Sequence, residues 1–490
     1  MEYLNRIDEY QEQMIQMLQE LVSIKSVEDK PLPNAPFGKG VAEAFSYMLK
    51  KAEVDGFETE NVDNYGGHIE FGGYLTDEAG DIIATSDEIM GIIGHLDVVP
   101  EGTDWAFDPY SGQVVDGKIY GRGTADDKGP IVAAYFAMKA LKDSGFIPAK
   151  KVRLILGLDE ETNWKGMEYY LSKVKPPSFG FTPDAEYPAI HGEKGILVFD
   201  LAKKLGKTIQ KGLELRTIKG GNAANMVADH ARAVVRADKM EVYEKVKELA
   251  AQYRNEHCTA DGQKAYGAKL NCKGIGKSLE ITVQGVSAHG ARPETGLNAI
   301  SILMDFLGKL DIINDDVNEF IEFYNQHIGF ELDGTSMGCG FSDEPSGKLV
   351  FNVGKLDFDD EAVRLTINIR YPVTFKENAI YEAMVPVMNK YNLGVIKGKV
   401  QEPIYIPADD PMIQTLMDVY KLHTGDEESK PIVIGGGTYA RAAKNIIAFG
   451  CVFPGEPSLA HQKNEYIEIG KLMLNAKIFA DAIYRLTKEL

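Results

Sequence analysis

Residues 89–97 read IMGIIGHLD, a short apolar run that ends in a histidine and an aspartate. Residues 152–158 read VRLILGL and form a second run of the same kind. Continuous apolar runs of this length are typical of strands that are buried on both faces of a parallel sheet. Between them, DKGP at 127–130 opens an apolar stretch that continues to residue 141, and Pro130 suits the first turn of a helix. The order strand, helix, strand indicates an α/β fold.

A second pattern occupies the middle of the chain, from about Glu193 to Lys397. Residues 364–370 read RLTINIR, in which apolar and polar side chains alternate as on a strand with one packed face and one open face. After about residue 400 the first pattern returns, with PIVI at 431–434 and a closing helix at 469–486. We therefore predict an α/β domain formed by residues 1–192 and 398–490, with an open mixed, largely parallel sheet flanked by helices. Residues 193–397 are predicted to form an inserted α+β domain.

The composition excludes several classes of protein. The 490 residues hold 53 Lys and Arg against 73 Asp and Glu, a formal net charge of −20, and so acidic a surface does not attract nucleic acid or an anionic membrane. No apolar run reaches the roughly 18 to 20 residues that span a bilayer, and the N-terminal residues are typical of a packed helix and not of a secretory signal. The spacing of the cysteines predicts neither a disulfide framework nor a thiolate metal site. We expect a cytoplasmic protein without nucleic-acid or membrane partners. The cysteines are Cys258, Cys272, Cys339 and Cys451.

Polar residues with metal-binding chemistry follow both apolar runs. His95 and Asp97 follow the first run, and Glu160 and Glu161 follow the second. In an open α/β sheet, ligands bind at the carboxyl ends of the strands. Residues two apart on a strand point the same way, so Asp97 can hold the His95 ring from behind. Each pair also has an ordinary explanation, a structural hydrogen bond for the first and a solvated turn for the second.

Three further candidates lie elsewhere in the chain. Asp126 precedes a predicted helix, Asp184 follows a short apolar run at 179–182, and His461 follows a strand-like segment. Helix capping explains one of the two aspartates at 126–127 well and the second poorly. Histidines and carboxylates at the strand exits of one sheet predict a hydrolytic centre with two metal ions. The predicted ligands are His95, Asp126, Glu161, Asp184 and His461.

With these motifs in place, the sequence resembles the dinuclear zinc exopeptidase and deacylase family that includes carnosinase, aminoacylase, glutamate carboxypeptidase and succinyl-diaminopimelate desuccinylase. The segments that carry the resemblance are residues 94–100, 120–130, 159–166, 183–186 and 287–290. GTADDKGP at 123–130, EETNW at 160–164 and HGEKG at 191–195 look most like the PepV-type dipeptidases of bacteria. The resemblance covers nearly the whole chain. It implies a zinc exopeptidase-like fold in which the inserted domain is a lid.

The resemblance also implies how the ligands share the ions. Asp126 bridges two divalent ions, His95 and Asp184 complete the site of one, and Glu161 and His461 complete the site of the other. Zinc is the expected metal, with manganese or cobalt as alternatives, because histidine and carboxylate ligands suit all three.

Catalytic and substrate-binding roles follow from the same resemblance. Glu160 is the implied general base, with Asp97 behind His95, and the lid residue His289 stabilises the oxyanion. Arg370, on the open face of its strand, clamps the C-terminal carboxylate of the substrate through two parallel hydrogen bonds. Further polar contacts to the substrate are expected from Asn225, Gly435, Gly436 and Gly437.

Several functions remain open at this point. The first is a metal-dependent dipeptidase that acts on small unblocked dipeptides, including the β-Ala-His and Xaa-His types. The resemblance to PepV-type enzymes, together with the size of the inserted domain, implies a monomer, with a dimer as the alternative. The second is an N-acyl amino acid deacylase or a succinyl-diaminopimelate desuccinylase. The third is a metal-binding protein without activity, against which Glu160 argues because storage needs no spare base. A hairpin predicted around residues 76–88 has no functional explanation.

Overall fold

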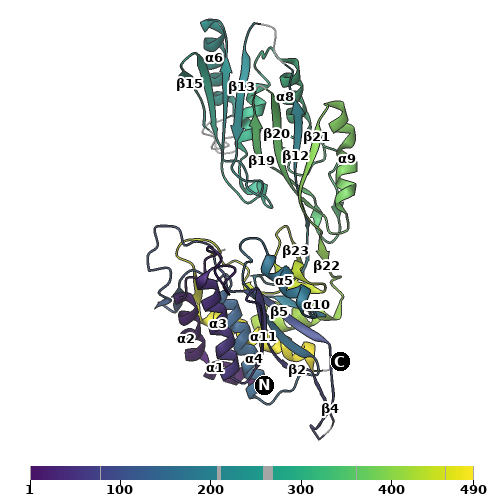
Figure 1. Cartoon of the computed structure of the whole chain (residues 1–490). Helices are drawn as coiled ribbons and strands as arrows, with labels where there is room; N and C mark the ends of the chain where they lie inside the picture. The colour runs from purple at the N-terminus through teal and green to yellow at the C-terminus, as the bar shows by residue number, and fades with distance from the viewer. Residues whose placement is uncertain are drawn as a thin grey trace. The chain divides into compact units, whose positions relative to one another are not determined.

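The structure is a computed structural model that describes residues 2–77, 79–206, 211–257, 269–359, 361–457 and 459–488. The chain forms two compact units (Figure 1). Unit 1 consists of Met1–His191, Ile406–Ile432 and Gly437–Leu490, and unit 2 consists of Gly192–Tyr405 and Val433–Gly436. The sequence placed the return to the first domain at residue 398. It comes after Tyr405 because strand β21, Gly394–Gln401, pairs with β12 inside unit 2.

Most strands of the predicted open mixed sheet belong to unit 1, whereas β22 and parts of β11 and β23 belong to unit 2. The strands of this sheet follow the order β1-β2-β8-β5-β9-β24-β11-β22, with β23 paired to β11. The central strands β8, β5, β9 and β24 run parallel, and the strands toward either side are antiparallel. The bounds are β1 Glu58–Val62, β2 Gly66–Gly72, β5 Ile89–His95, β8 Lys151–Gly157, β9 Phe179–Thr182, β11 Ile190–Glu193, β22 Ile404–Tyr405, β23 Ile432–Ile434 and β24 Ile446–Ala448.

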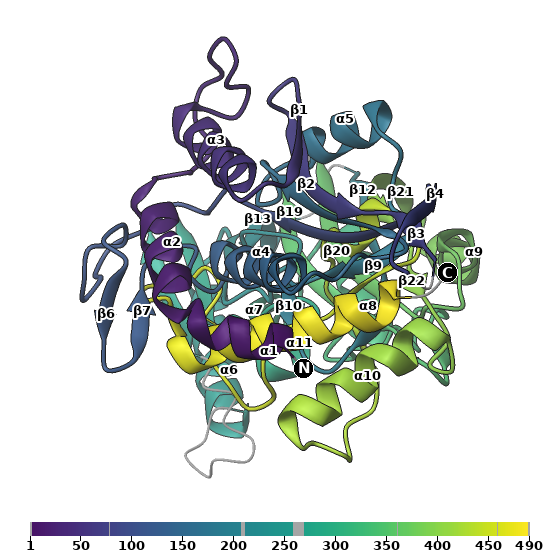
Figure 2. The same ribbon diagram turned by 90° about the horizontal axis from the view of Figure 1, so that it is seen from below.

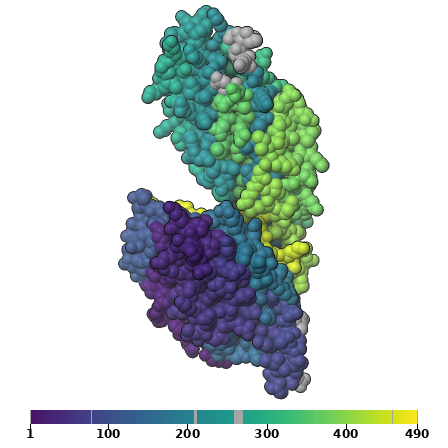
Figure 3. Space-filling model, in the orientation of Figure 1, coloured from purple at the N-terminus to yellow at the C-terminus, as the bar shows by residue number. Residues whose placement is uncertain are grey.

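Helices gather around α4 in unit 1 (Figure 2). Helix α4, Lys128–Asp143, is buried on nearly every side because it lies between the sheet and the helices α1, α2 and α11. The N-terminal helices form much of the visible surface of this unit in the space-filling view (Figure 3). The other helices of unit 1 are α1 Glu2–Glu9, α2 Gln11–Ser23, α3 Lys39–Val54, α5 Lys165–Lys173, α10 Pro411–Thr424 and α11 Ile469–Thr487.

Small two- and three-stranded sheets complete unit 1. Strands β26, β7 and β6 form one of them, β10 pairs with β25, and β3 pairs with β4 as the hairpin predicted around residues 76–88. Ile82 and Ile83 on β4 are exposed. The bounds are β3 Tyr74–Thr76, β4 Ile82–Thr85, β6 Gln113–Val115, β7 Lys118–Tyr120, β10 Ala185–Glu186, β25 Cys451–Val452 and β26 Tyr466–Glu468.

Unit 2 has a separate antiparallel sheet and a hydrophobic core of its own. The strand order is β15-β16-β14-β13-β19-β20-β12-β21. Alternation along β20 places Leu365, Ile367 and Ile369 in the core, as the sequence predicts. The bounds are β12 Gly195–Lys204, β13 Glu214–Gly220, β14 His230–Arg236, β15 Lys269–Ile275, β16 Ser278–Gln284, β17 Ser342–Asp343, β18 Gly347–Lys348, β19 Val350–Phe358, β20 Ala362–Tyr371, α6 Met240–His257, α7 Ala299–Leu307, α8 Asp315–His327 and α9 Glu377–Lys390.

Two expectations from composition concern the chain as a whole. Among the described residues, none of the helices has the length and apolar character that a membrane crossing requires. Cys272, Cys339 and Cys451 are free thiols, and Cys258 lies outside the described residues.

Candidate metal centre

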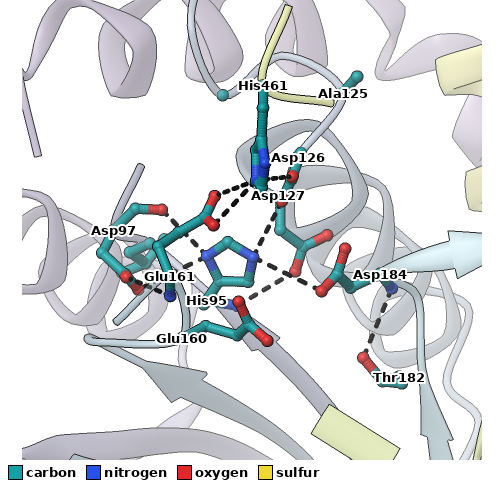
Figure 4. A network of polar contacts seen from close by, with 12 residues as sticks. His95, Asp97, Ala125, Asp126, Asp127, Glu160, Glu161, Thr182, Asp184 and His461 are labelled. Carbon is teal, nitrogen blue, oxygen red and sulfur yellow. Dashed lines mark hydrogen bonds and ion pairs between the residues drawn. The ribbon is translucent and has the colours of Figure 1, made fainter. Parts of the chain in front are cut away.

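The five predicted ligands come together at one edge of the unit 1 sheet (Figure 4). His95 is the last residue of β5, Asp126 lies in the loop before α4, and Glu161 lies in the loop after β8. Asp184 follows β9, and His461 lies between β25 and β26. Because β8, β5 and β9 run parallel, their carboxyl ends meet at the same edge and bring these loops together.

Asp126 stands between the two imidazoles. Its Oδ1 atom is 3.0 Å from His95 Nε2, and its Oδ2 atom is 3.2 Å from His461 Nε2. A second carboxylate accompanies each imidazole: Asp184 Oδ2 is 3.7 Å from His95 Nε2, and Glu161 Oε2 is 2.9 Å from His461 Nε2. The arrangement is therefore two histidine–carboxylate pairs that share one aspartate.

Among the residues that the structure describes, two overlapping groups have ligand atoms close enough to hold an ion. One is His95, Glu160 and Asp184, and the other is His95, Asp126 and Glu161, with the atoms of each group within 4.8 Å of one another. The first group differs from the expected set because the Glu160 carboxylate itself approaches His95 and Asp184. Glu160 thus lies beside two of the predicted ligands.

Negative charge is crowded in this site. Burial raises the pKa of Glu160 to about 9, and the Asp184 carboxylate adds to the shift. Burial, followed by the charge of Asp126, also raises the pKa of Asp184. Hydrogen bonds to Asp126 and Glu161 raise the pKa of His461 to about 10. Divalent cations would replace this mutual repulsion with attraction, and imidazoles and carboxylates are the donors they bind, so the residues present fit such ions.

A layer of groups behind His95 fixes its ring and backbone. The ring is fully buried, and its Nδ1 atom is 3.0 Å from the carbonyl oxygen of Asp97 and 3.5 Å from the Asp97 carboxylate. The other carboxylate oxygen of Asp97 accepts the Glu161 N–H at 3.1 Å. Asp97 therefore contacts both the His95 ring at the end of β5 and the Glu161 backbone in the loop after β8, as Figure 4 shows.

Helix capping, the alternative that the sequence left open for one of the two adjacent aspartates, does not apply to Asp127. Asp127 occupies the N-cap position of α4, but its side chain makes no capping hydrogen bond. Instead, its Oδ2 atom accepts the backbone N–H of His95 at 3.1 Å. The adjacent aspartates thus have separate roles: Asp126 faces the imidazoles, and Asp127 holds the strand that carries one of them.

Sequence reasoning missed two aromatic residues at this site. The indole N–H of Trp164 donates to the carbonyl oxygen of Glu160 at 2.8 Å. The Trp164 ring packs against Tyr439 at 5.0 Å, and Tyr439 packs edge-on against His95 at 6.1 Å between ring centroids. The sequence offers one signal for the first of them, a rare tryptophan directly after the acidic motif, and none for Tyr439.

The other predicted functional residues belong mostly to unit 2. Asn225, His289, Arg370, Gly435 and Gly436 lie there, and Gly437 belongs to unit 1. The Gly290 N–H donates to the Asn225 carbonyl at 2.7 Å, and Met226 forms an isolated bridge with His289. The segments that carry Asn225 and His289 are therefore paired within unit 2.

His289 has a defined proton position. The Ala291 N–H donates to His289 Nδ1 at 3.2 Å, so this nitrogen is an acceptor and the proton of a neutral ring sits on Nε2. Partial burial, together with the positive charges of Arg370 and Arg292, lowers the pKa of His289 and favours the neutral ring. The imidazole is thus prepared to donate one hydrogen bond from Nε2.

Arg370 is not on an open strand face, contrary to the prediction from alternation. It is only 4% exposed, because its Nε donates to Asn368 Oδ1 and its Nη1 donates to the carbonyl of Gly435, both at 2.9 Å. The segment that contains Gly435 is distant from β20 in the sequence. The alternation of residues along β20 therefore could not predict that this segment covers Arg370.

Comparisons with known proteins agree with this fold and identify the family of the chain. Residues 91–485 match the model of peptidase family M20/M25/M40. "Putative dipeptidase SH1171" of Staphylococcus haemolyticus is 37% identical over 489 residues, which cover 99% of each chain. "Putative dipeptidase YtjP" of Bacillus subtilis is 36% identical over 482 residues, which cover 97% of this chain and 98% of the relative.

A solved structure supports the same fold. The aminoacylhistidine dipeptidase from Vibrio alginolyticus aligns with a TM-score of 0.56 and 14% sequence identity, over 97% of this chain and 96% of that one. The resemblance drawn from sequence motifs is thereby confirmed, and the chain belongs to peptidase family M20/M25/M40, a family of metal-dependent hydrolases.

Proposed function

We propose that the protein is a dinuclear metal-dependent dipeptidase that hydrolyses small dipeptides with free ends. The observation that carries the proposal is the Asp126 carboxylate, which presents one oxygen to each of two imidazoles. A carboxylate with one oxygen toward each imidazole suits a hydrolytic centre whose two ions lie about 3.5 to 4 Å apart. The full-length relatives named as dipeptidases support the choice of a dipeptide over a longer substrate.

We assign the ligands to two ion positions. Asp126 is shared, His95 and Asp184 belong to the first position, and Glu161 and His461 belong to the second. Zinc is the expected metal, with manganese or cobalt as alternatives, since oxygen and imidazole donors suit all three. When bound, such ions polarise the scissile carbonyl and lower the pKa of water.

Glu160 is the proposed general base. Its carboxylate lies beside His95 and Asp184. From there, the carboxylate takes a proton from the attacking water and then donates it to the leaving amine. The indole of Trp164 holds the Glu160 carbonyl, which restricts where this carboxylate can swing. Asp97 keeps the His95 ring and the Glu161 backbone in place behind the reacting groups.

Residues of unit 2 are proposed to bind the substrate. The Nε2–H of His289 donates to the oxyanion that develops on the scissile carbonyl. Arg370 binds the terminal carboxylate, and its existing bonds to Asn368 and Gly435 hold the guanidinium plane in one orientation. Asn225 and the backbone of Gly435, Gly436 and Gly437 supply polar contacts to the peptide. Unit 2 is thus the proposed lid. We also propose that the protein is cytoplasmic and is a monomer. Light scattering of the purified protein measures the oligomeric state.

A substrate panel with and without metal tests the proposed function. Ala-Ala and β-Ala-His are compared with N-acetyl-alanine and N-succinyl-diaminopimelate, on protein as purified and after dialysis against a chelator. We expect hydrolysis of the free dipeptides only, abolition of that activity by the chelator, and its return when zinc is added. Preference for the acylated compounds would instead make the protein a deacylase or desuccinylase. Tight metal binding with no hydrolysis of any short peptide would favour a metal-binding protein without activity.

A further inference from the structure

We propose that Glu465 and Arg122 are positioning residues that fix the spacing between the loop of Asp126 and the loop of His461. This inference rests on the proposed function, and it gives the pair a specific role, which is to set the affinity of the ion position formed by Asp126, Glu161 and His461. Neither residue was a candidate from the sequence.

Glu465 organises the backbone that leads into Asp126. Its side chain is fully buried, and its Oε1 atom accepts N–H groups from Gly123 at 3.1 Å, Ala125 at 2.8 Å and Asp126 at 3.2 Å. Several N–H groups that converge on one anion form a rigid concave loop. The loop that presents the shared carboxylate is therefore folded around the charge of Glu465.

Arg122 connects this loop to the one that carries His461. Its Nη1 atom donates to Glu465 Oε2 at 2.6 Å and to the Gln462 carbonyl at 3.2 Å. Its Nη2 atom donates to the His461 carbonyl at 3.5 Å. The guanidinium is only 2% exposed, so water does not compete for these bonds. The Arg122 guanidinium thus joins Glu465, around which the Asp126 loop folds, to the backbone of His461 and Gln462.

The two loops have a common base. Strand β26 pairs with β7, and the Gly121 N–H donates to the Glu465 carbonyl at 3.0 Å. His461 itself has a φ of 64°, in the left-handed region that residues other than glycine rarely adopt, so its conformation depends on surrounding contacts. The strand pairing fixes the end of each loop that adjoins β7 or β26. The Arg122–Glu465 pair fixes the backbone near Asp126 and His461.

The contacts of the pair bear more on the second ion position than on the first. Glu465 binds the backbone of Asp126, which both positions share, and Arg122 binds the backbone of His461, which belongs to the second position alone. Arg122 also donates to the carbonyls of Pro100 and Glu101 at 3.5 Å, but no hydrogen bond described in the structure joins either member of the pair to His95 or Asp184. Loss of the pair should therefore weaken the second position first. Outer partners of metal ligands typically change metal affinity by about 10- to 100-fold when they are replaced.

The test is a measurement of zinc binding by Glu465→Gln, which removes the charge but keeps the shape. The number of ions retained after dialysis and their affinities are measured by metal analysis and by competition with a chromophoric chelator. We expect two tightly held ions in the wild type, and in the variant one tightly held ion and a second weakened by about 10- to 100-fold. Excess zinc should restore the kcat of the variant.

Glu70→Gln is the matched control. Glu70 is also a buried carboxylate in unit 1, and it pairs with Arg153 and Lys151 at 2.8 Å each. Arg153 lies near the start of β8, whereas the candidate site is at the end of that strand. We expect this variant to lose thermal stability but to keep both ions at wild-type affinity.

The outcomes separate the inference from the proposed function. A wild type that binds no divalent ions contradicts the proposed function itself. A wild type with two ions and a Glu465→Gln variant with the same two affinities overturns the inference alone. If the variant without metal is folded but much less stable than the wild type, the gain in Tm on adding zinc decides: a smaller gain than in Glu70→Gln supports the inference, and an equal gain overturns it.

Discussion

Asp126 and Asp127 are neighbours with different roles, and they define what single residues do at this site. Asp126 addresses two imidazoles through its two oxygens, while Asp127 accepts the backbone N–H of His95. Both oxygens of this carboxylate contact imidazoles, so a substitution there should disturb both proposed ion positions at once. Glu160, the proposed general base, is the residue at which we expect catalysis to be separable from metal binding.

The first residue-scale prediction is that Glu160→Gln loses turnover but keeps metal. The amide has nearly the shape of the carboxylate and cannot accept the proton, so kcat should fall by about 10²- to 10⁴-fold. Steady-state kinetics on Ala-Ala, with metal analysis of the same samples, measures both effects. Glu168→Gln, an exposed position on α5, serves as the control and should retain wild-type kcat. Near-normal turnover by Glu160→Gln would contradict the assigned mechanism.

Local sequence predicted these residues well because their signals are local. An apolar run that ends in a histidine or an acid marks both a buried strand and the residue at its exit, and so the sequence alone predicts that His95, Glu161 and Asp184 lie together. Tyr439 and Glu465 carry no such mark. Their contacts are made by segments distant in the chain, and an ordinary tyrosine or glutamate in the sequence does not reveal what it will meet.

At the scale of elements, strand β20 shows where periodicity stops being informative. Alternation correctly places Leu365, Ile367 and Ile369 in the core. It also suggests an open face for Asn368 and Arg370, yet these side chains are 2% and 4% exposed. Alternation in a sequence predicts that one face of a strand is polar, but it does not predict that this face is exposed to solvent. Whether another segment covers it is decided by the fold of the whole unit.

The element-scale prediction concerns the start of helix α7. The Asn298 side chain accepts the Ile300 N–H at 2.9 Å and donates to the Val353 carbonyl at 2.8 Å, so it caps the helix and ties it to β19. Asn298→Ala should lower the free energy of unfolding by about 0.5 to 2 kcal/mol. Denaturant unfolding measures the loss. Asn389→Ala, at an exposed position near the end of α9, should change it by less than about 0.5 kcal/mol.

At the scale of the molecule, the two hydrophobic cores share no residue. One core is formed entirely by residues of unit 1 and the other entirely by residues of unit 2. All five predicted metal ligands lie in unit 1. Metal binding should therefore stabilise one unit without directly stabilising the other.

Calorimetry with and without zinc tests this expectation. Chains with separate cores often unfold in more than one transition, and a ligand stabilises only the folded state that binds it, by about 2.7 kcal/mol at a concentration 100 times Kd. We expect zinc to raise the Tm of one transition and to leave the other in place. A single transition that moves as a whole, or two that move equally, would show that the units unfold together.

The insertion of unit 2 also sets the order in which the site can be assembled during translation. Four of the five predicted ligands, ending with Asp184, precede unit 2 in the chain, and His461 follows it. At about 5 to 20 residues per second, the ribosome releases the fifth ligand on the order of tens of seconds after the fourth. A nascent chain can thus bring His95 and Asp184 together early, but it cannot complete the predicted site until His461 has been synthesised. The hydrolase therefore cannot become active before the end of its own translation.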